Sequence, residues 1–253
     1  MNKRFVTVFA VIEILLYIIF LIFDFTDGYE TTAAVLKFIS IIVCMCVTFA
    51  ALITLNDREK TKKGVKSNDG KICLAAGLAA GAMFFTLVSD YYLLFNDNIF
   101  PGLITFCIVQ TVYLFVIIGA NYKTLAICLL IRIMLAFLGT ICLNGILPDE
   151  KALIITVLLY GISFLGNIIH LIMGIVFKNK ENPCLFIRPA IFLAGMILFL
   201  LCDINVLLFN VGDYIAVDST VLDTLSRAAV YLMWIFYLPA QVLIVFSNLR
   251  FEK

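Results

Sequence analysis

The sequence is poor in charge and nearly lacks histidine. Charged residues make up 14% of its 253 positions and hydrophobic residues 64%, whereas a soluble domain typically has about 25% charged residues. With a single histidine, His170, a zinc or haem site held by imidazoles is not expected. The eight cysteines are dispersed and include no Cys-x-x-Cys pair. We therefore expect no metal and no cofactor.

Several motifs that mark particular enzyme chemistries are also missing. There is no Gly-x-Ser-x-Gly elbow, no His-Glu-x-x-His helix, no P-loop and no dinucleotide fingerprint. Serine, metal and nucleotide chemistry therefore have no support in the sequence. The net charge of +1 gives no reason to expect a nucleic-acid partner.

Long apolar runs occupy most of the chain. A bilayer core of about 30 Å needs roughly 20 apolar residues in a helix, and polar residues divide the sequence into eight such runs. We predict an all-α integral membrane protein, a bundle of eight transmembrane helices that forms one multi-pass domain over residues 1–253. The expected spans are residues 5–23, 33–55, 72–95, 99–118, 122–143, 152–177, 185–209 and 228–249.

Basic residues are distributed unequally between the two sides of these spans. Fourteen loop lysines and arginines fall on the side of the two termini, and only Lys151 and Arg227 fall in loops on the other side. Because cytoplasmic loops are enriched in lysine and arginine, both termini are predicted to be cytoplasmic, with the protein in the cell membrane. The long connection at residues 210–227 is expected to cap the external mouth of the bundle.

Two aspartates, Asp90 and Asp203, lie inside the predicted spans. A carboxyl group near the centre of a bilayer costs at least about 2.5 kcal/mol on insertion scales, so it usually marks a polar interior or a functional site. Both aspartates have the same offset within their predicted spans, and we expect their carboxyls to meet. Mutual repulsion and desolvation would then favour the protonated form of one beside an ionised partner.

The surroundings of the two aspartates are similar. Aligning them superposes Met83 on Met196, and the next span of each half contains a glutamine, Gln110 and Gln241. These similarities make the two halves of the chain candidates for parallel four-helix repeats.

Other polar side chains within the spans are candidates for substrate contacts. The span at residues 152–177 contains a stripe at spacings of three and four, which either lines a wet region or joins helices by hydrogen bonds. Amides and phenols in the other spans suit the orientation of a headgroup or of water. The candidate binding residues are Lys37, Gln110, Tyr113, Tyr160, Asn167, Asn205, Tyr237 and Gln241.

Two basic residues within the spans need an explanation. Lys37 lies near the predicted level of the aspartates, where it either snorkels to the interface or pairs with a carboxylate. Arg132 is near the middle of its span and needs an anionic partner, such as Glu13 or a lipid phosphate.

Four blocks of the sequence have the spacing of one known family. They are Lys37 with the apolar run after it, FFTLVSDYYLL around Asp90, GLITFCIVQTVY from Gly102 to Tyr113, and the pair RPAIFLAGMILFLLCDINVLL and YLPAQVLIVFS. On these blocks the chain resembles the YhhN family of membrane lysoplasmalogenases, which includes the transmembrane 86 proteins. The resemblance covers nearly the whole chain. One position departs from it, because the family's Gly-His pair is Val109-Gln110 here, and glutamine does not titrate near neutral pH as histidine does.

The resemblance implies hydrolysis of the vinyl ether bond of a lysoplasmalogen to a fatty aldehyde and a glycerophospho-headgroup. Asp90 and Asp203 would be the catalytic acid and base, the partners would be a lysophospholipid substrate and membrane lipids, and no cofactor would be needed. Asp90 is the better candidate for the acid, since Asn205 makes the surroundings of Asp203 more polar.

Two other functions also use intramembrane carboxyls. A proton-coupled transporter or lipid translocator is the main alternative. An intramembrane aspartyl protease is disfavoured, because neither Asp90 nor Asp203 follows the glycine that such proteases carry.

Overall fold

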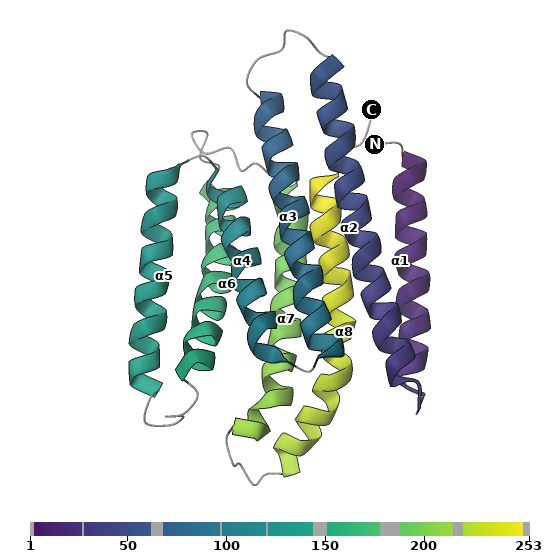
Figure 1. The fold of residues 1–253 in the computed structure, drawn as a ribbon, viewed down its shortest axis with the longest axis vertical. Coiled ribbons are helices and arrows are strands. Elements are labelled where there is room, and N and C mark those ends of the chain that lie inside the picture. The colour runs from purple at the N-terminus through teal and green to yellow at the C-terminus, as the bar shows by residue number, and fades with distance from the viewer. Residues whose placement is uncertain are drawn as a thin grey trace.

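Eight α-helices account for most of the residues that the structure describes (Figure 1). It is a computed structural model and describes residues 3–26, 28–61, 68–96, 98–119, 121–143, 151–177, 188–214 and 220–249. These ranges contain no strand, and all eight helices are long and apolar enough to cross a membrane, which confirms the all-α prediction. The helices are α1 (Lys3–Asp24), α2 (Glu30–Thr61), α3 (Asn68–Phe95), α4 (Ile99–Ile118), α5 (Tyr122–Leu143), α6 (Lys151–Phe177), α7 (Pro189–Tyr214) and α8 (Thr220–Asn248).

Four helix ends lie beyond the apolar runs. The end of α2 and the start of α3 project at one end of the bundle, and the end of α7 and the start of α8 project at the other (Figure 1). The prediction that residues 210–227 form a connecting loop is therefore wrong at both of its ends, and residues 215–219 lie outside the described part. Apolarity marks the part of a helix that suits lipid, whereas helical structure continues through polar residues with adequate helix propensity.

The helices form a bundle with a double-layered centre. The pair α1 and α2 lies at one edge, α5 and α6 lie at the other, and α3, α4, α7 and α8 lie between them (Figure 1). Successive helices run in opposite directions, so the start of α1 and the end of α8 are at the same end of the bundle.

Helix packing follows one pattern in both halves of the chain. In the first half, α1 packs on α2, α2 on α3 and α3 on α4, while α1 and α2 both contact α8. The other observed pairs are obtained when each helix is replaced by its counterpart in the other half. There α5 packs on α6, α6 on α7 and α7 on α8, while α5 and α6 both contact α4. The two halves thus make equivalent contacts.

A close approach of α7 to α8 forms part of the central packing. A Cβ atom at Gly195 would lie 2.9 Å from Ile244 Cγ1 and 3.0 Å from the carbonyl oxygen of Ala240, so only glycine fits here without a shift. The superposed methionines of the two halves, Met83 and Met196, are both buried. This packing holds α7, the helix that carries Asp203, against α8.

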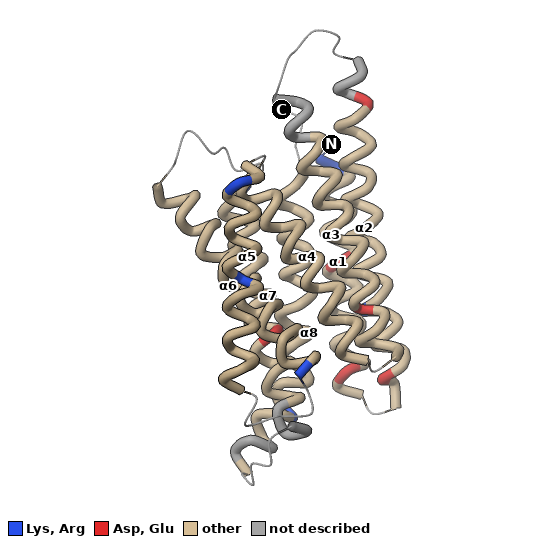
Figure 2. The backbone as a smooth tube through the Cα atoms, turned by 60° about the vertical axis from the view of Figure 1, so that its left-hand side comes forward, with Lys and Arg blue, Asp and Glu red and all other residues tan. Residues whose placement is uncertain are grey.

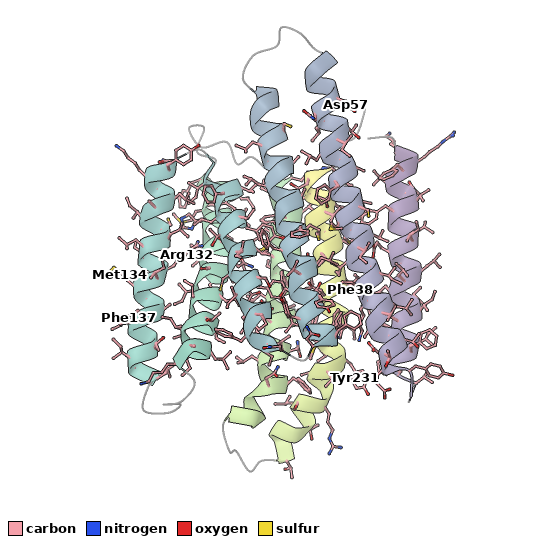
Figure 3. The ribbon with its side chains drawn as sticks, viewed as in Figure 1. Phe38, Asp57, Arg132, Met134, Phe137 and Tyr231 are labelled. Carbon is pink, nitrogen blue, oxygen red and sulfur yellow. The ribbon has the colours of Figure 1, made fainter. Side chains whose placement is uncertain are left out.

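Charged residues are sparse along the tube of the described helices (Figure 2). On α5 the apolar side chains mostly face outward, and Met134 and Phe137 point away from the bundle (Figure 3). Arg132, on the same helix, is buried on its inner side. An apolar outer face, with the one arginine turned inward, suits a helix at the lipid-facing edge of a bundle.

Candidate active site

Asp90 and Tyr237 form a buried polar pair at the bundle's centre. Asp90 on α3 is only 3% exposed, and the hydroxyl of Tyr237 on α8 lies 2.7 Å from each of its two carboxyl oxygens. A hydrogen bond is electrostatically stronger where water is excluded. Tyr237 therefore fixes the direction in which the carboxyl of Asp90 points.

Asp203 has a tyrosine partner of its own. The hydroxyl of Tyr160 on α6 donates to Asp203 Oδ2 on α7 at 2.7 Å. Asp203 is partly buried, so it is less enclosed than Asp90. The two predicted catalytic carboxyls are thus each held by a phenol from a neighbouring helix.

Aromatic rings connect the two carboxyl–tyrosine pairs. The ring of Phe199, one helical turn before Asp203, lies 5.4 Å from the ring of Tyr237 and 5.5 Å from that of Phe106. Phe106 in turn lies 5.8 Å from Tyr160. The two pairs therefore belong to one region of the interior, with apolar rings between them.

Two buried polar atoms near Asp90, both in the side-chain amide of Gln241, lack hydrogen-bond partners. Thr86 Oγ1 and the Tyr113 hydroxyl, which are also buried, interact with each other. Thr86 precedes Asp90 by one turn and Gln241 follows Tyr237 by one turn, so each lies on the same helix face as a member of the pair. Because buried polar atoms are nearly always paired, the free amide of Gln241 marks a place for the polar atoms of a ligand or of water.

Lys37 is connected to the region of Asp90 through aromatic rings. Its ammonium forms an ion pair with Asp24 at 2.7 Å, so of the two expected roles the structure supports pairing with a carboxylate. The same nitrogen lies 4.5 Å from the ring centroid of Trp234, in the range of a cation–π contact. The Trp234 ring packs edge-on against that of Tyr237 at 5.4 Å. A change at Lys37 can therefore affect Asp90 through two packed rings.

Gln110 and Asn167 belong to a second polar cluster. Asn167 on α6 donates to the side-chain and backbone oxygens of Gln110 on α4, and it accepts a hydrogen bond from Arg132 on α5. Glu13, suggested as a partner for Arg132, is instead bonded by Ser40 and Cys44 on α2. That suggestion is wrong because α1 and α5 lie at opposite edges of the bundle (Figure 1).

The polar stripe of α6 joins helices. Tyr160 reaches α7, Asn167 reaches α4 and α5, and His170 contacts Cys128 of α5 at 3.6 Å. Asn205 has a local role, because its amide donates to the backbone oxygen of Leu201 one turn earlier on α7. Its side chain is not directed to Asp203.

Sequence reasoning missed three side chains that shape the region. Thr86 and Phe199 precede Asp90 and Asp203, respectively, by four residues, and Trp234 precedes Tyr237 by three. These helical spacings place each of them on the face that carries the site. Helical periodicity around Asp90, Asp203 and Tyr237 could therefore have identified all three.

Within the described ranges, no three side chains of His, Cys, Asp or Glu come together as a metal site would require. Comparison of the chain with protein-family models, with curated proteins and with solved structures found no significant match.

Proposed function

We propose that this protein is a membrane hydrolase that cleaves the vinyl ether bond of a lysoplasmalogen-type lipid. The observation that carries the proposal is the pair of carboxyls, Asp90 and Asp203, each oriented by a tyrosine hydroxyl in one aromatic interior. Vinyl ether hydrolysis needs a proton donor, a base for water and stabilisation of a transient positive charge. Two carboxyls in different environments can meet these needs without other groups.

In the proposed mechanism Asp90 is the acid. It is the more buried of the two, and burial favours the neutral, proton-carrying form of a carboxyl group. It transfers its proton to the outer alkenyl carbon, which leaves a positive oxocarbenium carbon next to the ether oxygen. Asp203, in its ionised form, stabilises that carbon and takes a proton from the attacking water. The resulting hemiacetal collapses to the fatty aldehyde and the free hydroxyl of the glycerophospho-headgroup.

The proposed setting is the cell membrane, with the eight helices as spans and both chain ends in the cytoplasm. The unequal distribution of loop lysines and arginines supports this orientation. The equivalent helix contacts of the two halves support two four-helix repeats, with Asp90 and Asp203 at corresponding positions.

The test is incubation of the purified full-length protein with a lysoplasmalogen in detergent and in liposomes. We expect a fatty aldehyde and a glycerophospho-headgroup in equal amounts from the vinyl ether lipid and neither from its saturated ether analogue. If no aldehyde forms in either medium while the protein moves lipid or protons across liposomes, the transporter or translocator function replaces this one.

A further inference from the structure

Arg132 presents a buried positive charge that its protein neighbours leave partly unsatisfied. The residue is 4% exposed, and of its two terminal nitrogens Nη2 donates to Asn167 Oδ1 at 2.9 Å, while Nη1 has no hydrogen-bond partner. No carboxylate of the described residues bonds to this guanidinium. A buried arginine left in this state is costly, particularly within a membrane.

The neighbouring hydrogen bonds determine which atoms remain free. Arginine only donates, so Asn167 must turn its oxygen to Arg132 and its amide nitrogen to Gln110. That nitrogen donates to Gln110 Oε1 at 2.9 Å, so Gln110 turns its own oxygen towards Asn167 and leaves Nε2 as the free end. Gln110 Nε2 is buried and has no partner. Two unpaired donors and no unpaired acceptor therefore flank the same asparagine.

The backbone of α6 is shaped to admit the guanidinium. A Cβ atom at Gly166 would lie 2.9 Å from Arg132 Nη2 and 3.2 Å from its Nε. Glycine at this position lets the planar group lie directly against the helix and reach Asn167. The cluster is thus built from α4, α5 and α6.

We propose that Arg132 and Gln110 bind the phosphodiester of the lysophospholipid headgroup. A positively charged site that offers only donors matches a phosphate, which offers only acceptors, and arginine is the preferred side chain for such groups. Asn167 follows Tyr160 by seven residues on α6, about 10 Å along the helix axis. The separation is comparable with the length of a glycerophosphate group, so one lipid can contact this cluster and the carboxyl region. The identity of the lipid rests on the proposed function.

Ligand binding, measured apart from hydrolysis, tests the site. The probes are a saturated 1-alkyl lysophospholipid, which cannot be cleaved as a vinyl ether, and the matching 1-alkylglycerol, which lacks phosphate. We expect the wild-type protein to bind the phosphate-bearing lipid at least about tenfold more tightly than the alkylglycerol, which is the effect of one charge-assisted interaction. Inorganic phosphate serves as a competitor of the lysophospholipid. If phosphate displaces the lipid, the site takes a free anion, and if phosphate does not, the site takes a lipid headgroup.

Two variants separate ligand binding from a structural role. Arg132→Gln removes the charge, and Gln110→Glu supplies the guanidinium with a carboxylate from the protein itself. Both should abolish the tenfold preference, whereas Gln110→Glu should keep or raise the melting temperature. Arg227→Gln, at an exposed arginine of α8, is the control for net charge and should retain the preference.

The result that overturns the proposal is a phosphate preference that persists in both variants, or that is missing in the wild type. Failure of the proposed function has a different signature. A protein that shows the Arg132-dependent preference but releases no aldehyde binds a phospholipid for another purpose, while aldehyde release without that preference leaves the hydrolase intact and removes this site.

Discussion

Tyr237 places its hydroxyl at the same distance, 2.7 Å, from both carboxyl oxygens of Asp90, a residue 147 positions away in the chain. The single phenolic proton is shared by two acceptors, so neither carboxyl oxygen has the hydrogen bond of Tyr237 to itself. The carboxyl plane is fixed while either oxygen remains able to carry the catalytic proton. Tyr237 is therefore a positioning residue for the acid in the proposed mechanism.

Tyr237→Phe should lower kcat for aldehyde release by about tenfold or more and leave KM nearly unchanged. The reason is that a hydrogen bond to a charged or proton-transferring group is typically worth about 1.5–3 kcal/mol, and the phenylalanine keeps the ring contacts with Phe199 and Trp234. Tyr231→Phe is the matched control on the same helix, since the Tyr231 ring stacks on Phe25 and its substitution should change neither constant. An equal effect of both substitutions on kcat would contradict the positioning role.

Asp90→Asn and Asp203→Asn should each reduce the rate of aldehyde release by at least about 10²-fold, the lower range for losing a positioned acid or base. An amide has nearly the shape of the carboxyl but neither gives nor takes a proton near neutral pH. Asp57→Asn is the control, because Asp57 lies near the projecting end of α2, away from the site (Figure 3). Chelators should change the rate little. A variant with full activity at either aspartate would remove the paired-acid mechanism.

The Lys37–Asp24 pair predicts a non-additive effect on stability. Both side chains are largely buried, at 9% and 14% exposure. Lys37→Met and Asp24→Asn should each destabilise the protein by about 3 kcal/mol, because each leaves a buried charge unpaired. The double variant should be more stable than either single one. Thermal unfolding in detergent measures this.

Trp234 supplies a direct readout of the same pair, because it is the only tryptophan in the chain. Removing the ammonium that lies 4.5 Å from its ring should shift its fluorescence emission in Lys37→Met. A spectrum like that of the wild type, together with additive losses of stability, would show that the pair is not formed in solution.

The orientation of the protein can be tested with reporters. The fourteen-to-two distribution of loop lysines and arginines predicts that a reporter fused after Lys253 is cytoplasmic and that one inserted near Asp218 is external. Finding both reporters on the same side would contradict the eight-span arrangement in the membrane.

The helices were predictable from the sequence because the signal is strong and local. Each run of roughly 20 apolar residues corresponds to a helix, as α4 and α5 show with identical bounds in the prediction and the structure. The end of α2 and the start of α8 were missed because polar residues interrupt the apolar pattern but do not end the helix. Lateral packing is not local, and nothing in the sequence placed α1 and α5 at opposite edges.

The candidate site was predictable in its residues and less so in their partners. Intramembrane polarity singled out Asp90, Asp203, Tyr160 and Tyr237, yet which phenol meets which carboxyl depends on how α6 and α8 pack. Arg132 shows the same limit, since its need for a partner was clear and its neighbour Asn167 was not. Pairing between helices is a tertiary property that spacing along one helix does not encode.

Gln110→His should keep or raise the rate of aldehyde release. An unprotonated ring nitrogen can accept the hydrogen bond from Asn167 in place of Gln110 Oε1, while the other ring N–H replaces the free amide donor. The imidazole also adds a group that titrates near neutral pH, so the pH profile should gain a new dependence there. Gln110→Leu is the matched comparison, because it removes both the acceptor and the donor and should raise KM. If the histidine and leucine variants have the same KM, the side chain at this position makes no hydrogen bond that the substrate uses.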